Sequence, residues 1–247
     1  MTNSVKQVSA SYGIRKFLGG AIRTELLPYI ACFCTAALFC GLTLRDVYHQ
    51  RRLERDKGIK QLLSRLIPVR ASEILAGRTQ FRGDPQAPFT LVEFGDYECP
   101  PCRATQRILA SELDKCKGSV RLDFRQFPLA NLHPHARDAA VAAESAYLAG
   151  KFWNVHDLLF AADLSKPGSI SGCLAAGQVA ADPKRSRRLA KSDASLATLL
   201  GVNGTPSFVL CCPDGRVFWV AEISDLGSYL NQYAELGCNP GQQGCSL

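Results

Sequence analysis

The chain has 247 residues, of which 47% are hydrophobic, and carries a formal net charge of +7. This length and apolar content suit one globular domain with an appendage, and the absence of repeats and low-complexity tracts excludes solenoid and fibrous classes. The positive charge is concentrated between Arg45 and Arg70, where eight basic residues stand against three acidic ones. A nucleic-acid-binding arm would need aromatic or groove-reading partners, and only Tyr48 is nearby, so we favour a basic collar beside a lipid surface.

An uncharged run of 19 positions covers residues 26–44, between Arg23 and Arg45. As a helix this run spans about 28 Å, close to the hydrocarbon thickness of a bilayer. The sequence therefore predicts a single transmembrane anchor that follows an N-terminal tail over residues 1–25. A cleaved signal peptide is the alternative, but no convincing small-x-small cleavage site lies near the end of the run.

Two arguments disagree on which side of the membrane the rest of the chain lies. Near the anchor, four basic residues precede it and six follow it, and this balance favours a cytoplasmic domain. The eleven cysteines instead fit an oxidising compartment, and large domains can cross a membrane regardless of charge. We expect the domain to lie outside the cytoplasm, on the periplasmic or extracytoplasmic side.

A basic, partly helical linker is expected over residues 45–79. Within it, residues 46–67 are interpreted as helix because four aliphatic residues between Ile59 and Leu66 form an apolar edge. A spacer is the simplest role for this helix. A short dimerising coil is the alternative, but the segment holds too few heptads for a stable one.

Two cysteines, Cys99 and Cys102, stand two residues apart between an apolar, strand-like run over residues 89–94 and a helical stretch. At such a strand-to-helix junction, unpaired backbone N–H groups and the helix dipole favour a thiolate. Cys99 is therefore the predicted nucleophile, at an exposed helix start. Pro100 and Pro101 suit the first helical turn, which needs no backbone donors, and they hold Cys102 close enough to attack a mixed disulfide.

Glu93 is an acidic residue inside the strand that precedes the dithiol. Most glutamates face water, and an edge-strand position would place this one there. Because Glu93 lies in an apolar run just before the two cysteines, we favour a buried carboxyl that accepts the proton of Cys102.

Further elements are predicted after the dithiol. They are a strand over 120–126, helices over 136–149, 151–160 and 185–200, a hairpin of strands over 207–212 and 216–222 joined by Pro213-Asp214-Gly215, and a last helix over 223–236. The elements predict an α/β domain over residues 80–236 with a helical insertion at about 128–200. A C-terminal tail over 237–247 follows.

Four pieces of the sequence together resemble the DsbA-like branch of the thioredoxin superfamily. They are Cys-Pro-Pro-Cys at 99–102, Glu93 six residues before it, Gly204-Thr205-Pro206-Ser207-Phe208, and Gly150-Lys151-Phe152-Trp153 with His156 and Asp157. The resemblance implies a thioredoxin fold with an inserted helical subdomain. It also implies a cis bond before Pro206, with Thr205 offering backbone groups to an extended substrate. Without the resemblance, Pro206 would be interpreted as an ordinary trans turn proline.

A zinc site is the main alternative for the Cys-x-x-Cys motif. Such a site needs two further Cys or His ligands at suitable spacing, yet there is no second motif of this kind, and Cys211 and Cys212 are adjacent. His133, His135 and His156 lack a metal-like arrangement with the dithiol and are expected to be structural or surface residues. We expect no metal and no cofactor.

The other cysteines form two groups. Three lie in the predicted anchor, where a cysteine behaves as a small apolar residue. Six lie outside it, and of these Cys238 and Cys245 could close a loop in the Gly-rich tail. The sequence leaves the pairing of the other four open; these are Cys116, Cys173, Cys211 and Cys212.

Residues and resemblance together predict a membrane-anchored thiol:disulfide oxidoreductase, with the direction of exchange left open. The catalytic set is Cys99, Cys102 and Glu93, and the substrate-binding set is Pro100, Pro101, Thr205 and Pro206. Expected partners are protein thiols or disulfides, a redox partner that restores the active pair, and the membrane, but no nucleic acid. Two alternatives remain: a thioredoxin-fold binding or chaperone module, and a chaperone for a soft metal such as Cu(I) that uses the same sulfurs.

Overall fold

The computed structural model of the chain describes residues 44–55, 57–58, 65–116 and 118–235. The predicted anchor, apart from Leu44, lies outside these residues, as do both predicted tails. Among the described residues, no helix combines the length and the apolar character needed to cross a membrane.

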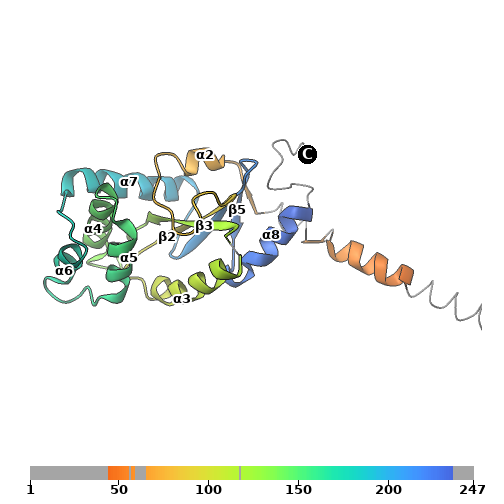
Figure 1. Cartoon of the computed structure of the whole chain (residues 1–247), viewed down its shortest axis with the longest axis horizontal. Helices are drawn as coiled ribbons and strands as arrows, with labels where there is room; N and C mark the ends of the chain where they lie inside the picture. The colour runs from red at the N-terminus through yellow and green to blue at the C-terminus, as the bar shows by residue number, and fades with distance from the viewer. Residues whose placement is uncertain (1–43, 56, 59–64, 117, 236–247) are drawn as a thin grey trace, which may run out of the picture. The chain divides into compact units, whose positions relative to one another are not determined.

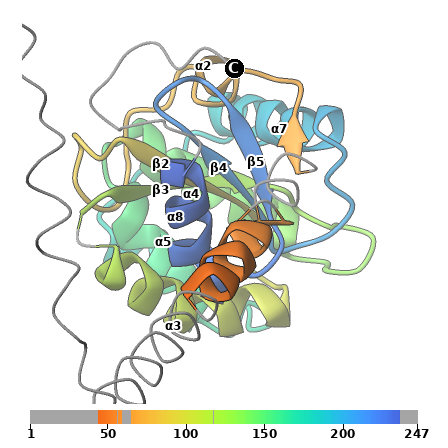
Figure 2. The same cartoon turned by 90° about the vertical axis from the view of Figure 1, so that its right-hand side faces the viewer.

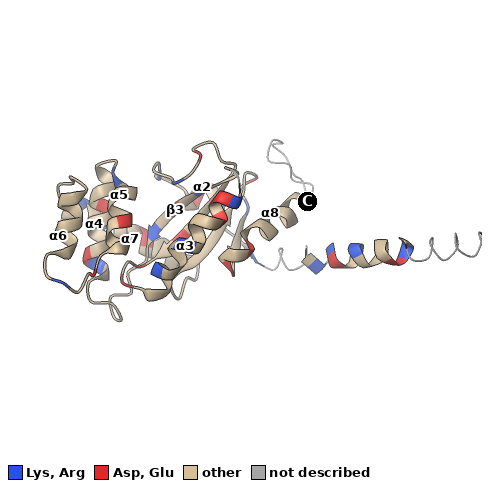
Figure 3. Ribbon diagram, turned by 60° about the horizontal axis from the view of Figure 1, so that its bottom comes forward, with Lys and Arg blue, Asp and Glu red and all other residues tan. Residues whose placement is uncertain are grey.

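Two compact units divide the chain, residues 1–54 and residues 55–247. The described part of the first unit, from Leu44 to Glu54, is helical, and its side chains are exposed. Acidic and basic residues both occur along this helix (Figure 3). The second unit contains the predicted dithiol and is described below.

A five-stranded sheet with the order β1-β5-β4-β2-β3 forms the centre of the second unit (Figure 1). The strands are β1 (Leu66–Ile67), β2 (Phe89–Gly95), β3 (Val120–Gln126), β4 (Ser207–Cys211) and β5 (Val217–Val220). β2 pairs in parallel with β3, whereas the other neighbouring strands pair antiparallel. The predicted strands over 89–94 and 120–126 and the predicted hairpin are confirmed.

The helix predicted over residues 46–67 is wrong at its C-terminal end, where the structure has the strand β1. Leu66 and Ile67 pair antiparallel with β5, and the backbone N–H of Trp219 donates to the carbonyl of Arg65 at 3.0 Å. The edge of the sheet satisfies the backbone polar groups of this segment. That edge is built by residues about 150 positions later in the chain, so local spacing of aliphatic residues cannot reveal it.

Helices cover the sheet on both faces (Figures 1 and 2). They are α2 (Ala71–Ile74), α3 (Pro100–Lys115), α4 (Ala136–Leu148), α5 (Phe152–Ala161), α6 (Ser169–Ala176), α7 (Pro183–Leu199) and α8 (Leu226–Glu235), with a 3₁₀ turn η2 (Ile223–Asp225) before α8. The helices predicted over 136–149, 151–160 and 185–200 are confirmed. The last predicted helix begins as the 3₁₀ turn, and α6 was missed because its Ser- and Gly-containing sequence has weak helix propensity.

β2 is buried along its whole length because it lies between two strands and under helices on both faces. Leu91 belongs to a hydrophobic cluster with Leu109 of α3 and Tyr233 of α8. Val92 belongs to a second cluster, with Ile74 of α2. Since successive side chains of a strand alternate between faces, Glu93 shares the α3 face with Leu91.

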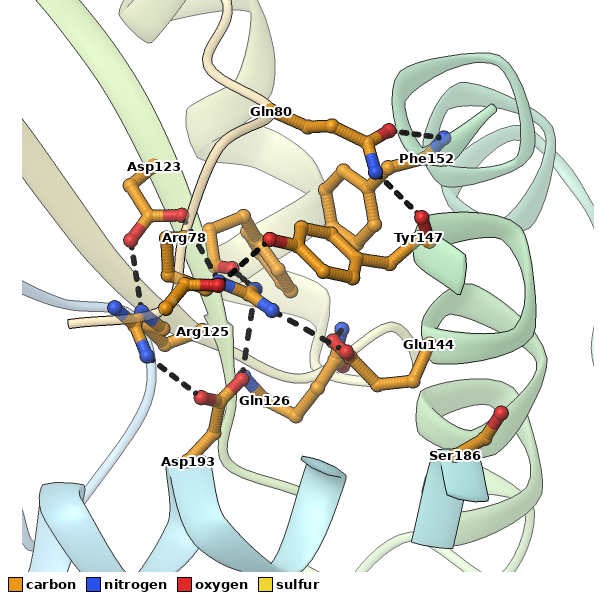
Figure 4. A network of polar contacts seen from close by, with 12 residues as sticks. Arg78, Gln80, Asp123, Arg125, Gln126, Glu144, Tyr147, Phe152, Ser186 and Asp193 are labelled. Carbon is orange, nitrogen blue, oxygen red and sulfur yellow. Dashed lines mark hydrogen bonds and ion pairs between the residues drawn. The ribbon is translucent and has the colours of Figure 1, made fainter. Parts of the chain in front are cut away.

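A buried network of charged side chains joins β3 to the helices α4 and α7 (Figure 4). Its members are Arg78, which lies between α2 and β2, together with Asp123 and Arg125 of β3, Glu144 of α4 and Asp193 of α7. Arg78 places Nη1 3.2 Å from Glu144 Oε2 and Nε 3.4 Å from Asp123 Oδ1. Arg125 Nη1 donates to Asp193 Oδ1 at 2.9 Å. Each buried acid therefore faces a guanidinium, and the pairs fix the helices on the sheet.

Arg78→Met removes a guanidinium that faces three buried carboxylates. We expect it to lower the free energy of unfolding by about 3–5 kcal/mol, because the remaining buried charges lose their compensation. Urea denaturation measures the change. Arg107→Met on the exposed side of α3 is the matched control, expected to change stability by less than about 0.5 kcal/mol. Equal effects of the two substitutions would contradict this account.

Candidate dithiol site

The two cysteines lie where β2 passes into α3. β2 ends at Gly95, and Cys99 is the N-cap residue of α3 with extended backbone angles, φ −68° and ψ 118°. Its backbone N–H donates to the Asp96 carbonyl at 3.2 Å, and its own carbonyl accepts from Arg103 N–H at 3.1 Å. The two prolines occupy the first helical turn, where no intrahelical donor is needed. The predicted strand-to-helix junction is confirmed.

Cys99 is less accessible than the sequence predicts. Its exposed fraction is 4%, and that of Cys102 is 0%. The segment that follows α7 reaches the first cysteine, because the Cys99 Sγ donates to the Thr205 carbonyl at 3.3 Å. A cis peptide bond joins Thr205 and Pro206, as the resemblance implies. An exposed helix start was the wrong expectation, since a segment about a hundred residues later packs over it.

Cys102 occupies a site that disfavours its thiolate. Burial raises the pKa of the Cys102 thiol, a backbone hydrogen bond from Asp96 lowers it, and the negative charge of Glu93 raises it further. A deprotonated Cys102 therefore forms only when a neighbouring group accepts its proton.

Glu93 is fully buried, and its negative charge acts on the thiol of Cys102. Burial raises the pKa of its carboxyl to about 8, against the lowering effects of a hydrogen bond from Gln106 and the charge of Arg82. The alternative of a water-facing edge-strand acid is wrong, because β2 lies inside the sheet with β3 and β4 on either side. A carboxyl with this pKa exchanges a proton near neutral pH, as a general acid–base group requires.

Three residues that the sequence analysis did not assign to the site are joined to Glu93 by successive hydrogen bonds. Gln106 Nε2 lies 3.1 and 3.2 Å from the two oxygens of the Glu93 carboxyl. His156 Nε2 is 3.4 Å from Gln106 Oε1, and the Tyr97 hydroxyl is 3.1 Å from His156 Nδ1. The signal for Gln106 was its position four residues after Cys102, on the same face of α3.

A loop after β3 is fastened to the segment that leads into α3. His133 Nδ1 lies 2.8 Å from Asp96 Oδ2, and His135 Nδ1 lies 2.8 Å from Glu98 Oε1. Asp96 also accepts from the backbone N–H of Leu129 at 2.8 Å. These two histidines are thus structural, as expected, and they hold the loop next to the dithiol.

Four further cysteines are described, and all are free thiols: Cys116, Cys173, Cys211 and Cys212. The adjacent Cys211 and Cys212 belong to different hydrophobic clusters, on opposite faces of the sheet. Cys238 and Cys245 lie outside the described residues. Among the described residues, no group of three or more Cys, His, Asp or Glu side chains is placed to hold a metal ion.

Residues 76–231 match the sequence model of a protein family described as thioredoxin. The chain belongs to the thioredoxin family. The solved structure of Pseudomonas aeruginosa DsbA2 superposes with a TM-score of 0.51 and 24% identity, and covers 65% of this chain and 96% of that one. A thioredoxin-like oxidoreductase from Silicibacter pomeroyi gives a TM-score of 0.52 and 27% identity, and covers 66% and 96%. The predicted thioredoxin fold is therefore confirmed.

Curated relatives match this thioredoxin-family chain over only part of their own length. The Na(+)/H(+) antiporter NhaA 3 of Salinispora tropica is 34% identical over 172 residues, which are 60% of this chain and 26% of the antiporter. Disulfide bond formation protein D of Bacillus subtilis is 31% identical over 102 residues, which are 36% of this chain and 44% of that protein. The chain thus spans less than half the length of either relative.

The buried Glu93 carboxyl predicts a pH dependence of stability. Its pKa of about 8 in the folded chain exceeds the ordinary value of 4.5, so between these values the unfolded chain binds fewer protons. The free energy of unfolding should therefore fall as pH rises from 4.5 to about 8, by up to about 1.4 kcal/mol for each pH unit. Urea denaturation of wild type and Glu93→Gln across this range isolates the effect, because glutamine does not titrate.

The advantage in stability of Glu93→Gln over wild type should grow with pH through that window and be constant above it. The same substitution at the exposed Glu235 is the control, expected to leave the wild-type curve in place. A constant difference between Glu93→Gln and wild type from pH 5 to pH 8 would show that Glu93 is not held neutral by burial.

Proposed function

We propose that the chain is a thiol:disulfide oxidoreductase that exchanges disulfides with protein substrates through Cys99 and Cys102. The observation that carries this proposal is the meeting of three parts: the cysteine pair at the start of α3, the Thr205 carbonyl against Cys99 Sγ, and the buried Glu93 carboxyl beside Cys102. The names of two similar proteins support the same activity. The Silicibacter pomeroyi protein is named a thioredoxin-like oxidoreductase, and the Bacillus subtilis protein is named for disulfide bond formation.

Exchange would begin at Cys99. In the oxidising direction, a substrate thiolate attacks Cys99 Sγ, the bond between Cys99 and Cys102 breaks, and its electron pair passes to the Cys102 sulfur. A second substrate thiolate then attacks the substrate sulfur of the mixed disulfide and releases the Cys99 thiolate. Two electrons pass from substrate to enzyme, and the reverse sequence reduces a substrate disulfide. A redox partner then restores the starting form of the pair.

Glu93 would donate a proton to Cys102 and accept it in the reverse step. When the Cys102 sulfur leaves as a thiolate, the neutral Glu93 carboxyl supplies its proton, and in the reverse step the Glu93 carboxylate takes it back. Both forms of Glu93 are accessible near neutral pH because burial raises its pKa to about 8. Cys102 needs such a proton acceptor because its surroundings disfavour the thiolate.

Substrate would dock as an extended segment across the face formed by Thr205 and Pro206. The Thr205 carbonyl points at Cys99 Sγ, so a peptide paired with the backbone there brings its sulfur towards the nucleophile. Pro100 and Pro101 would form the opposite wall at the start of α3. Main-chain pairing gives little sequence selectivity, which suits an enzyme that acts on many protein thiols.

Membrane anchoring by residues 26–44, with the domain outside the cytoplasm, is part of the proposal. The uncharged run and the basic collar after it support the anchor. A dithiol that exchanges protein disulfides is of most use where disulfides persist, and this supports the extracytoplasmic side.

Substitution of the two cysteines should separate their roles. Cys99→Ser should abolish the enzyme-catalysed part of insulin reduction by dithiothreitol, because the nucleophilic sulfur is lost and the remaining Cys102 thiol is fully buried with a raised pKa. Cys102→Ser should retain a reactive thiol and accumulate mixed disulfides with substrate, since the resolving sulfur is lost. Mass spectrometry of non-reduced samples detects these adducts.

Cys116→Ser, at the other end of α3, is the matched control and should reduce insulin as wild type does. If Cys102 is alkylated first while Cys99 stays inert, the assigned roles are wrong. Retention of Cu(I) by wild type at millimolar glutathione, without insulin reduction, would favour the metallochaperone function instead.

The topology has its own test. A reporter that is active only outside the cytoplasm, fused after Leu247, should be active, and the chain should stay with the membranes after a carbonate wash. Deletion of residues 1–44 is the control and should move the chain to the soluble fraction. A reporter that is active only in the cytoplasm would contradict the proposed side and agree with the charge balance around the anchor.

A further inference from the structure

Glu93 has few polar partners for a buried carboxyl. The strand positions paired with it are Phe124 of β3 and Phe208 of β4, and neither side chain can donate a hydrogen bond. Among the described residues, the hydrogen bonds to its carboxyl come from Gln106. A buried carboxylate without donors is costly, so the Gln106 amide is well placed to decide how readily Glu93 ionises.

The geometry fixes the direction of the hydrogen bonds that end at Glu93. When Glu93 is ionised its carboxylate only accepts, so Gln106 presents its NH₂ group to Glu93 and its Oε1 to His156. The Oε1 atom also only accepts, so His156 must carry its proton on Nε2. The His156 Nδ1 then accepts from the Tyr97 hydroxyl at 3.1 Å. In this series of hydrogen bonds from Tyr97 through His156 and Gln106, every donor points towards Glu93.

His156 is kept in this neutral form by its surroundings. It is fully buried, with the rings of Phe124 and Trp153 at centroid distances of 4.7 and 4.9 Å. Burial, together with the nearby charge of Arg82, lowers its pKa well below the ordinary value. A neutral imidazole whose Nδ1 accepts has a single N–H, and here that donor is aimed at Gln106.

We propose that Gln106 and His156 are positioning residues for the dithiol, which orient the Glu93 carboxyl as the proton acceptor of Cys102. Cys102 and Gln106 are four residues apart on α3, so the same helix face carries the reacting sulfur and the amide that holds its base. A glutamine side chain has no proton to exchange at neutral pH, so these hydrogen bonds orient Glu93 and do not conduct protons to it. This inference rests on the function proposed above.

Charged and titratable groups from every neighbouring element bear on this carboxyl. Arg82, from the loop before β2, lowers its pKa, as Gln106 does. Cys102 of α3 and Tyr97, which precedes α3, are both affected by the negative charge of Glu93. Burial opposes the ionisation of Glu93. When the Gln106 donor is lost, Arg82 is the one group among these that still favours the ionised carboxylate.

Gln106→Leu and His156→Phe test the proposal. Leucine keeps the helix but removes the donor, and phenylalanine keeps the aromatic packing but removes the N–H that orients the amide. The pKa of Glu93 should rise in Gln106→Leu by about one pH unit or more, which is about a tenfold loss of its ionised form at pH 7. His156→Phe should shift it in the same direction by a smaller amount. A ¹³C NMR titration of labelled glutamate, with Glu93→Gln to assign the signal, measures these pKa values.

The pH profile of the exchange reaction is the second readout. The rate at which Cys102 resolves a preformed mixed disulfide at Cys99 should rise with pH as Glu93 ionises, and Gln106→Leu should move this rise to higher pH by the same interval. Gln80→Leu is the matched control, because Gln80 is a half-buried glutamine that bonds Tyr147 and Phe152 instead. It should leave the midpoint of the profile unchanged whatever its effect on stability.

The outcomes separate this inference from the proposed function. An unchanged Glu93 titration in both Gln106→Leu and His156→Phe would overturn the positioning role, even if all variants exchange disulfides. A shifted Glu93 titration together with a wild type that exchanges no disulfide would overturn the proposed function and the role of Glu93 as a base. A shift in both the titration and the exchange profile would support both.

Discussion

The burial of the Glu93 carboxyl in the middle of the sheet is the constraint on which the active region depends. β2 runs between β3 and β4, so Glu93 has strands on both sides and α3 above it. Water is excluded, and the carboxyl takes a pKa of about 8 because its charged form is poorly solvated there. Its negative charge disfavours the thiolate of Cys102, whose proton it is suited to accept.

Two kinds of buried charge coexist in this domain. The network of Figure 4 is compensated, because Arg78 faces all three of its acids and Arg125 faces two of them, and its role is to join α4 and α7 to β3. Glu93 is held by an amide and by the more distant charge of Arg82 instead. Burial raises the pKa of Glu144 in the network to about 7 even though Arg78 lowers it, and it raises the pKa of Glu93 to about 8 against the opposing effects of Gln106 and Arg82. The two sites differ in what they act on: the network joins helices to the sheet, whereas the charge of Glu93 affects the thiol of Cys102.

The dithiol also depends on a contact between distant parts of the chain. α3 presents Cys99 at its N-terminus, and the segment around the cis Thr205–Pro206 bond closes over it after four intervening helices. The helices between β3 and β4 also supply His156, which lies against Gln106 of α3. The inserted helices thus contribute to the surroundings of the dithiol and do not only cover the sheet.

The sequence by itself determined the local features of this protein. The apolar, strand-like run before the dithiol located β2, the position of Cys99 and Cys102 after it placed the dithiol at a helix start, and the resemblance identified Pro206 as cis. Tertiary structure alone decided that Leu66 and Ile67 form an edge strand, that Cys99 is covered, and that Gln106 and His156 meet at Glu93. Each of these depends on residues that are far apart in the chain. Local periodicity reports the face on which a side chain lies, but the partner that meets it is set by how the elements pack.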